Sequence, residues 1–174
     1  MPNVWTHLLF GERIAIQSGM NFSSHQKEFQ LGTQGPDSFF YYHFWPWKKT
    51  DQSVLQIGNQ IHKKHCGEFL LNMIDYLKEK PNPLLKAYVF GFMSHHVLDR
   101  NAHPYIVYRS GEEGNKHQKL EIYIDTLMMK KYKDIDTWKV PVYKKLDLGH
   151  NLPQSILAML TNLMQQVHGV NRGT

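Results

Sequence analysis

Metal-ligand side chains recur at helical spacing in the segment FGFMSHHVLDRNAHPY, residues 90–105. His95, Asp99 and His103 follow one another at intervals of four residues, which on an α-helix places them on one face about 6 Å apart along the axis. The same face carries an apolar stripe upstream, formed by Leu84, Tyr88 and Phe92. Burying an imidazole and a carboxylate without partners costs several kcal/mol. We therefore expect either a satisfied polar network or a metal ion at this point.

A second pair with the same spacing occurs downstream. His117 and Glu121 are four residues apart, at the edge of a predicted apolar stripe.

His7 shares a helix face with Phe10 and Ile14. A single histidine in such a position is more often a buried core residue than a metal ligand, so His7 alone would decide nothing.

Two further candidates come from segments between these pairs. Asp37 directly follows Pro36 at a predicted helix start. The helix dipole would stabilise a carboxylate there without any metal. His62 and His65 lie three residues apart and both face the predicted core. The pattern does not choose between them, nor between His95 and its neighbour His96.

The complete set of candidates contains more ligands than one ion needs. Histidine nitrogens and carboxylate oxygens that converge from different elements are the usual ligands of zinc. The alternative is a set of buried hydrogen bonds between histidines and carboxylates, without metal. We interpret the pattern as a multinuclear metal site, with these candidate ligands: His7, Asp37, His62 or His65, His95, Asp99, His103, His117 and Glu121.

Length and composition are those of a globular protein. The chain has 174 residues, of which 41% are hydrophobic and 20% charged, and we expect residues 1–174 to form a single domain. The net charge of +5 suits phosphate esters, anionic membrane surfaces or nucleic acid without selecting one. Cys66 is the single cysteine, which excludes an intramolecular disulfide. No signal peptide or membrane-spanning stretch is recognisable, so we expect a cytoplasmic location.

Hydrophobic periodicity predicts an all-α, multi-helix bundle around the metal site. We expect helices over residues 6–17, with Thr6 as the N-cap, and over 23–31, 116–132 and 153–168. One or two helices should cover 53–79. Another should begin near residue 83 and end near Ala102, because Pro104 disfavours helical geometry at His103. Residues 134–152 should be irregular.

The densest aromatic run of the chain covers residues 39–47, from Phe39 to Trp47. Followed by Lys48 and Lys49, it could contact a membrane surface, because Trp and Tyr beside Lys suit the headgroup zone. It could equally line a substrate cleft or fill the core.

Five ordered segments together resemble the zinc-dependent phospholipase C family. They are THLLFGERI, LGTQGPDSFFYY, IGNQIHKKH, FMSHHVLDRNAHPY and NKHQKLEIYIDT, and they cover most of residues 6–126. The family is all-α and includes secreted bacterial enzymes that prefer phosphatidylcholine; zinc nucleases specific for single strands are more distantly similar. Family members continue beyond the point where this chain stops, so we expect a compact or truncated version.

The resemblance implies a cluster of three zinc ions. One would bind Asp37, a histidine of IGNQIHKKH (His62 is preferred) and His95, with Asp99 bridging to a neighbouring ion. A second would bind the downstream residues His103, His117 and Glu121. A third would bind His7 and Asp99, completed in the family by the amine and carbonyl of an N-terminal tryptophan. Here Trp5 is internal, so we expect two or three ions.

The implied activity is hydrolysis of a phosphodiester, most readily in a phospholipid headgroup. Asp37 and Asp99 are the expected catalytic residues, Asp37 as zinc ligand and general base and Asp99 as the bridge between ions. One alternative is a zinc nuclease or nucleotide phosphodiesterase, which the basic charge and the aromatic residues would also suit. Another is a non-catalytic, zinc-stabilised domain that binds membrane surfaces.

Overall fold

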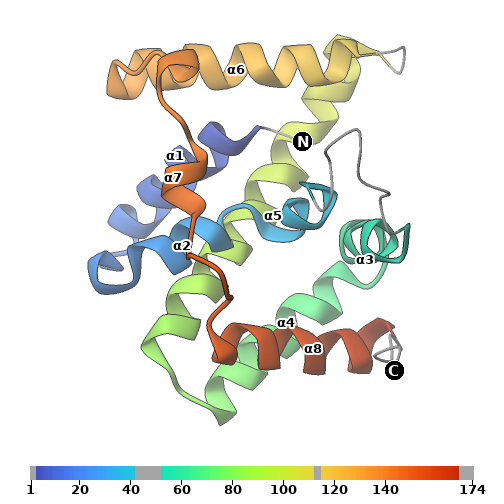
Figure 1. Ribbon diagram of the computed structural model, residues 1–174. Coiled ribbons are helices and arrows are strands. Elements are labelled where there is room, and N and C mark those ends of the chain that lie inside the picture. Colours follow the sequence, from blue (N-terminus) through green and yellow to red (C-terminus); the bar gives the residue numbers. More distant parts are fainter. Residues whose placement is uncertain (1–2, 42–51, 112–114, 169–174) are drawn as a thin grey trace.

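The chain folds into helices joined by short connections (Figure 1), and no strand occurs in residues 3–41, 52–111 and 115–168, which the computed structural model describes. The all-α prediction is confirmed. The elements in chain order are α1 (Val4–Gln17), the 3₁₀ helix η1 (Ser23–His25), α2 (Gln26–Gly32), the 3₁₀ helix η2 (Gly35–Tyr41), α3 (Gln52–Lys63), α4 (Cys66–Glu79), α5 (Pro83–Ser110), α6 (Lys116–Lys133), the 3₁₀ helix η3 (Thr137–Lys139), α7 (Tyr143–Leu146) and α8 (Gln154–His168).

Helix α5 is the central element of the bundle. It runs obliquely through the middle of the molecule, with α1 and α2 on one side, α4 and α8 at its lower end and α6 across its upper end (Figure 1). Asn82 begins the helix by accepting hydrogen bonds from the backbone N–H groups of Leu84 and Leu85, and Pro83 occupies the first helical position.

Two apolar clusters hold the other helices in place. The larger joins α4, α5 and α8, where Phe69, Met73, Phe92, Ile156, Met159 and Leu163 are almost fully buried. The smaller packs α1 against α6 through Trp5, Leu8, Leu9 and Met129. The first cluster anchors the lower part of α5, and the second brings α1 alongside α6 near the upper part of α5.

Helix α5 does not end where the sequence predicted. Pro104 removes one backbone donor, but the helix continues through it to Ser110. Ile106 is buried on the continuing segment, and α5 packs against α6 there. This packing outweighs the roughly 3 kcal/mol cost of an internal proline. The prediction of an end near Ala102 was wrong, and His103 lies inside the helix.

The N-cap of α1 also differs from the prediction. Asn3, not Thr6, occupies this position, and its side chain accepts a hydrogen bond from the Val4 N–H. The N-cap therefore lies three residues earlier than the periodicity indicated. In the irregular region 134–152, η3 and α7 are short helices that the sequence did not predict.

Two glycines permit the close crossing of α2 and α5. A Cβ built on Gly91 would lie 2.4 Å from the carbonyl oxygen of Phe29, and one on Gly32 would lie 2.2 Å from that of Tyr88. Both clashes are with backbone atoms, which cannot rotate away. Because η2 follows α2 directly, this crossing sets how near η2 approaches α5.

Gly91→Ala should therefore lower the free energy of unfolding by roughly 3 kcal/mol, the cost of overpacking a tight core. Gly67→Ala is the matched control, since its Cβ would meet nothing within 4 Å and alanine is favoured in a helix. Urea denaturation followed by circular dichroism measures both. Equal stability of the two variants would contradict the close crossing.

Candidate metal centre

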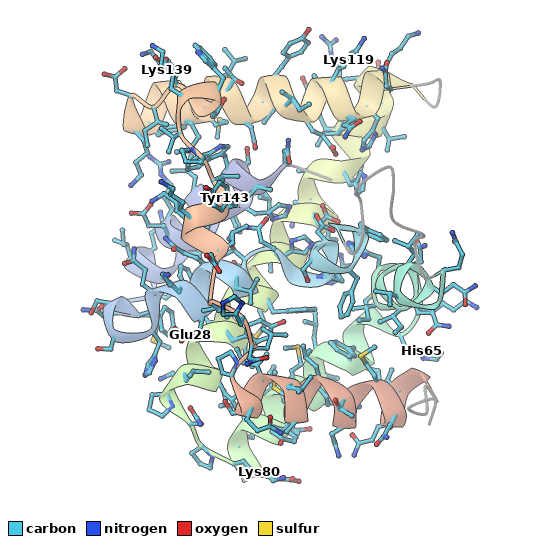
Figure 2. The ribbon with its side chains drawn as sticks, viewed as in Figure 1. Glu28, His65, Lys80, Lys119, Lys139 and Tyr143 are labelled. Carbon is cyan, nitrogen blue, oxygen red and sulfur yellow. The ribbon has the colours of Figure 1, made fainter. Side chains whose placement is uncertain are left out.

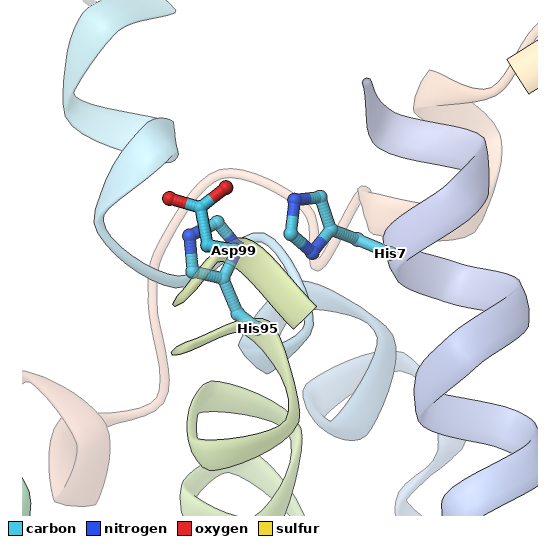
Figure 3. Close-up of side chains that lie close together, drawn as sticks. All are labelled: His7, His95 and Asp99. Carbon is cyan, nitrogen blue, oxygen red and sulfur yellow. The ribbon is translucent and has the colours of Figure 1, made fainter. Parts of the chain in front are cut away.

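Helices α1 and α5 bring three candidate ligands into contact. His7 projects from α1 toward His95 and Asp99, which are one turn apart on α5 (Figure 3). The imidazoles of His7 and His95 are stacked, with centroids 4.1 Å apart. All three side chains are buried, and one ligand atom from each lies within 4.8 Å of the others.

A second group shares His95 with the first and adds η2 and α3. Asp37 Oδ1 lies 2.9 Å from His62 Nε2 and 3.8 Å from His95 Nε2. The opposite nitrogens of both rings contact backbone carbonyls: His62 Nδ1 is 2.9 Å from the Gly58 oxygen, and His95 Nδ1 is 3.1 Å from the Thr33 oxygen. With the proton on Nδ1, the Nε2 lone pair of each ring faces the group, as in metal-binding histidines.

The third group joins α5 to α6. His103 Nε2 lies 3.3 Å from His117 Nε2, and His117 Nε2 lies 2.8 Å from Glu121 Oε1. Asp99 Oδ2 is 3.6 Å from His103 Nδ1, so Asp99 lies between this group and the first. All eight sequence candidates therefore come together in three adjacent groups.

The structure separates the alternatives that the sequence left open. His65 has a left-handed backbone with φ of 56°, and its side chain is exposed. Its Nδ1 lies 3.0 Å from Oε2 of Glu68. His62, one helical turn earlier, points toward Asp37. On α5, His95 belongs to two groups, whereas His96 belongs to none of the three that the described residues form.

The donor atoms fit a divalent cation such as zinc. Asp99 Oδ1 and His95 Nε2 are buried, and neither has a hydrogen-bond partner among the described residues. Such orphaned acceptors cost about 1–3 kcal/mol each unless something satisfies them. Imidazole nitrogen and carboxylate oxygen are the ligands that zinc prefers, and a cation would satisfy both atoms.

The charge states also suit metal binding. Burial, aided by the neighbouring His7, lowers the pKa of His95 well below its usual value, so this ring is neutral at neutral pH. Burial alone would raise the pKa of Asp99, but the neighbouring imidazoles, His103 first, outweigh it and lower the pKa. Neutral imidazole and ionised carboxylate are the forms that ligate metals.

Gly35 explains how η2 approaches His95 so closely. Its φ of +51° is a left-handed conformation, and an added Cβ would lie 2.5 Å from the imidazole of His95. Any larger residue would separate η2 from α5. Asp37, two residues later, would then lose its position between His62 and His95.

Sequence reasoning missed Asp125, which connects α6 to the start of α1. Its buried carboxylate accepts hydrogen bonds from the backbone N–H groups of Trp5 and Thr6, at 3.0 and 2.8 Å, and from the Thr6 hydroxyl. The available signal was spacing, because Asp125 follows Glu121 by four residues and so lies on the same helix face. This carboxylate fixes the first turn of α1, which carries His7.

The same contacts bear on the expected tryptophan ligand. The Trp5 nitrogen is a peptide N–H within α1, donated to Asp125, and the Trp5 side chain is buried in the smaller apolar cluster. With the preceding residues in place, Trp5 therefore offers a peptide N–H and not the free amine that the resemblance implies for the third ion, unless the chain is trimmed to Trp5.

A cleft of about 460 Å³ opens beside the three groups. The apolar part of its lining includes Phe69, Leu70, Phe92 and Val107. The polar part includes His62, His95, Asp99 and His103 together with His96 and Arg100. Burial, with the nearby charge of Arg100, lowers the pKa of His96. The cleft thus combines apolar side chains with the candidate ligands.

Part of the aromatic run lies next to this region. Phe39 packs against the larger apolar cluster, and the Phe40 ring centroid is 5.4 Å from that of His62. These two residues pack inward. Residues 42–47 of the run lie outside the described residues, so membrane contact through residues 39–47 stays a prediction.

Comparison with known proteins places the chain in a family. A profile described as "Zinc dependent phospholipase C" matches residues 6–165, which is most of the sequence. The chain belongs to the zinc-dependent phospholipase C family, a family of hydrolases. A search of curated proteins and a search of solved structures each returned no match.

Asp125→Ala should lower the free energy of unfolding by about 2 kcal/mol, because two buried N–H groups lose their acceptor. Asp125→Asn retains an acceptor oxygen and should lose less. Chemical denaturation of the two variants and the unmodified protein gives the comparison. If both variants kept the free energy of unfolding of the unmodified protein, Asp125 would not hold the start of α1.

Proposed function

We propose that this protein is a zinc-dependent phospholipase C, which hydrolyses the phosphodiester between the glycerol and the headgroup of a phospholipid. The observation that carries the proposal is the set of three ligand groups at the wall of a partly apolar cleft. Membership of the family supports it independently.

Each group has the donor types to hold one ion. Asp37, His62 and His95 would hold the first, with Asp99 at its border. His103, His117 and Glu121 would hold the second. His7 and Asp99 would contribute to a third, for which Trp5 offers no free amine unless the chain is trimmed to it. When bound, zinc lowers the pKa of a coordinated water and neutralises charge on phosphoryl oxygens.

Asp37 would accept a proton from the attacking water. Burial raises its pKa, opposed by the adjacent imidazole of His62, and a raised pKa brings a carboxylate nearer to the range in which it works as a general base at neutral pH. The water oxygen forms a bond to phosphorus, its proton moves to Asp37, and the bond from phosphorus to the glycerol oxygen breaks. The glycerol oxygen takes up a proton from solvent water, and Asp37 afterwards returns its proton to solvent.

The cleft supplies the remaining contacts. Arg100, an exposed cation in the polar part of its lining, would attract the phosphodiester, and guanidinium groups suit phosphate oxygens. The apolar part formed by Phe69, Leu70, Phe92 and Val107 would receive the glycerol side of the lipid. Asp99, ionised between two groups, would hold the spacing between ions.

Single-stranded nucleic acid is the second candidate substrate, favoured by the net charge of +5. The apolar part of the cleft lining favours the lipid, because a nucleic-acid backbone gains little from it. Hydrolysis of a soluble short-chain phosphatidylcholine, compared with that of single-stranded DNA by the zinc-loaded protein, separates the two. Greater activity on DNA would replace the lipid proposal with the nuclease one.

His62→Ala should remove one ion and lower phosphodiesterase activity by at least about two orders of magnitude, since even residues that only orient metal ligands cost 10–100-fold. His65→Ala is the matched control from the same segment, because His65 is exposed and turned away. It should keep full metal content and activity. The reverse result would assign the ligand to His65.

Asp99→Asn removes a charge with little change of volume, so the fold should survive. We expect loss of bound zinc and at least about 100-fold less activity, measured by elemental analysis and by release of the phosphorylated headgroup. A fully metallated and active Asp99→Asn protein would contradict the bridging role.

A further inference from the structure

Helix α6 lies along the edge of the molecule and has two contrasting faces (Figure 1). Its inner face buries Glu121, Asp125 and Met129. Its outer face exposes two large apolar side chains, Tyr123 at 63% and Leu127 at 69%. These two residues are four apart and so are neighbours on the helix surface. Neither side chain belongs to an apolar cluster formed by the described residues.

Lysines flank this apolar pair. Lys116 and Lys119 precede it on the helix and Lys130 and Lys131 follow it, and all four are exposed. At 3.6 residues per turn, Lys116, Lys119 and Lys130 fall on the same side as Tyr123 and Leu127. Figure 2 shows Lys119 at the outer edge of the molecule, directed away from the other helices.

The acidic residues of α6 itself do not lie on the outer face. The helix has two of them, Glu121 and Asp125, and both are buried on the inner face. Beyond its end, Asp134 and Asp136 form ion pairs with Lys130. Just past that turn, Trp138 in η3 is 70% exposed. The outer face of α6 thus combines exposed lysines with a tyrosine and a leucine.

We propose that the outer face of α6, defined by Lys116, Lys119, Tyr123, Leu127 and Lys131, docks on an anionic phospholipid surface. A helix with lysines around exposed aromatic and aliphatic side chains is typical of interfacial binding. Tyr and Trp also favour the headgroup zone. The identity of this partner rests on the proposed phospholipase activity. This surface differs from the aromatic run at residues 39–47.

Charge argues against a second copy of the chain as the occupant. A symmetric contact would bring the lysines of two α6 helices together, and like charges repel. Nucleic acid would satisfy the lysines but would leave the aliphatic Leu127 without a role. Anionic lipid satisfies both parts, because its headgroups pair with lysine and its interface accepts apolar side chains.

Docking in this way would bring substrate close to the centre. His117 and Glu121 lie on the inner side of the same helix, and a helix with its side chains is about 10–12 Å across. A membrane on the outer face would therefore lie about one helix diameter from the third ligand group. The surface would raise the local concentration of lipid without taking part in the chemistry.

The test uses sedimentation of the full chain with vesicles of phosphatidylcholine, alone or mixed with phosphatidylglycerol. We expect binding to the mixed vesicles that weakens with salt. Lys119→Glu should weaken it at least about five-fold, the equivalent of roughly 1 kcal/mol for each lysine near an anionic surface. Tyr123→Ser combined with Leu127→Ser should weaken it about ten-fold or more.

Matched controls come from other exposed positions. Lys86→Glu on α5 changes the same charge far along the chain, and Leu71→Ser on α4 removes a leucine that is 63% exposed. Both should bind vesicles like the unmodified protein. Equal losses in the control and α6 variants, or no loss in either, would overturn the proposal. So would dimerisation through α6 or preferential binding of this face to single-stranded DNA.

Hydrolysis of a soluble short-chain phosphatidylcholine is measured for the same variants. The α6 variants should retain it, because none of the changed residues belongs to the centre. Lack of hydrolysis by every variant, with selective loss of vesicle binding, would reject the proposed activity and keep the docking surface. Hydrolysis by an unmodified protein that does not bind vesicles would reject the docking surface and keep the proposed activity.

Discussion

The structure depends on burying imidazoles and carboxylates next to one another in the interior of a helical bundle. His95 and Asp99 are one turn apart on α5, and each has a buried atom that no described side chain or backbone group satisfies. Four other elements, α1, η2, α3 and α6, each bring candidate ligands toward them. Without a cation, this concentration of lone pairs would oppose folding. A bound cation would convert the same atoms into a link between the helices.

Much of the fold serves to bring these candidate ligands next to one another. Gly32 and Gly91 allow α2 to cross α5 closely, which delivers η2 and Asp37. The carboxylate of Asp125 holds the first turn of α1 and therefore the position of His7. The apolar cluster of α4, α5 and α8 fixes the lower part of α5 but contributes no ligand. Stability and site construction are thus largely assigned to different parts of the molecule.

The sequence predicted the helical class and the convergence of the ligands, because both follow from spacing. His95 and Asp99 continue an apolar stripe, and His117 and Glu121 repeat the interval. It could not choose between His62 and His65, since both fit the face of one continuous helix. The choice arises from the break at His65, whose left-handed backbone turns its ring outward. Local pattern contains no signal for that turn.

The end of α5 and the role of Asp125 depend on tertiary contacts for a similar reason. Pro104 is a local signal for a helix end, but packing of Ile106 and contact with α6 override it. Asp125 contacts Trp5 and Thr6, which are 120 and 119 residues away in sequence at the first turn of α1, so only the folded arrangement reveals its role. The single-domain organisation and the cytoplasmic location expected from the sequence stay predictions.

Anomalous diffraction at the zinc edge, from crystals of protein purified without chelator, tests the central interaction most directly. We predict separate anomalous peaks between Asp37, His62 and His95 and between His103, His117 and Glu121. Absence of any peak there, with the imidazoles hydrogen-bonded to one another around an empty centre, would contradict the metal-linked bundle.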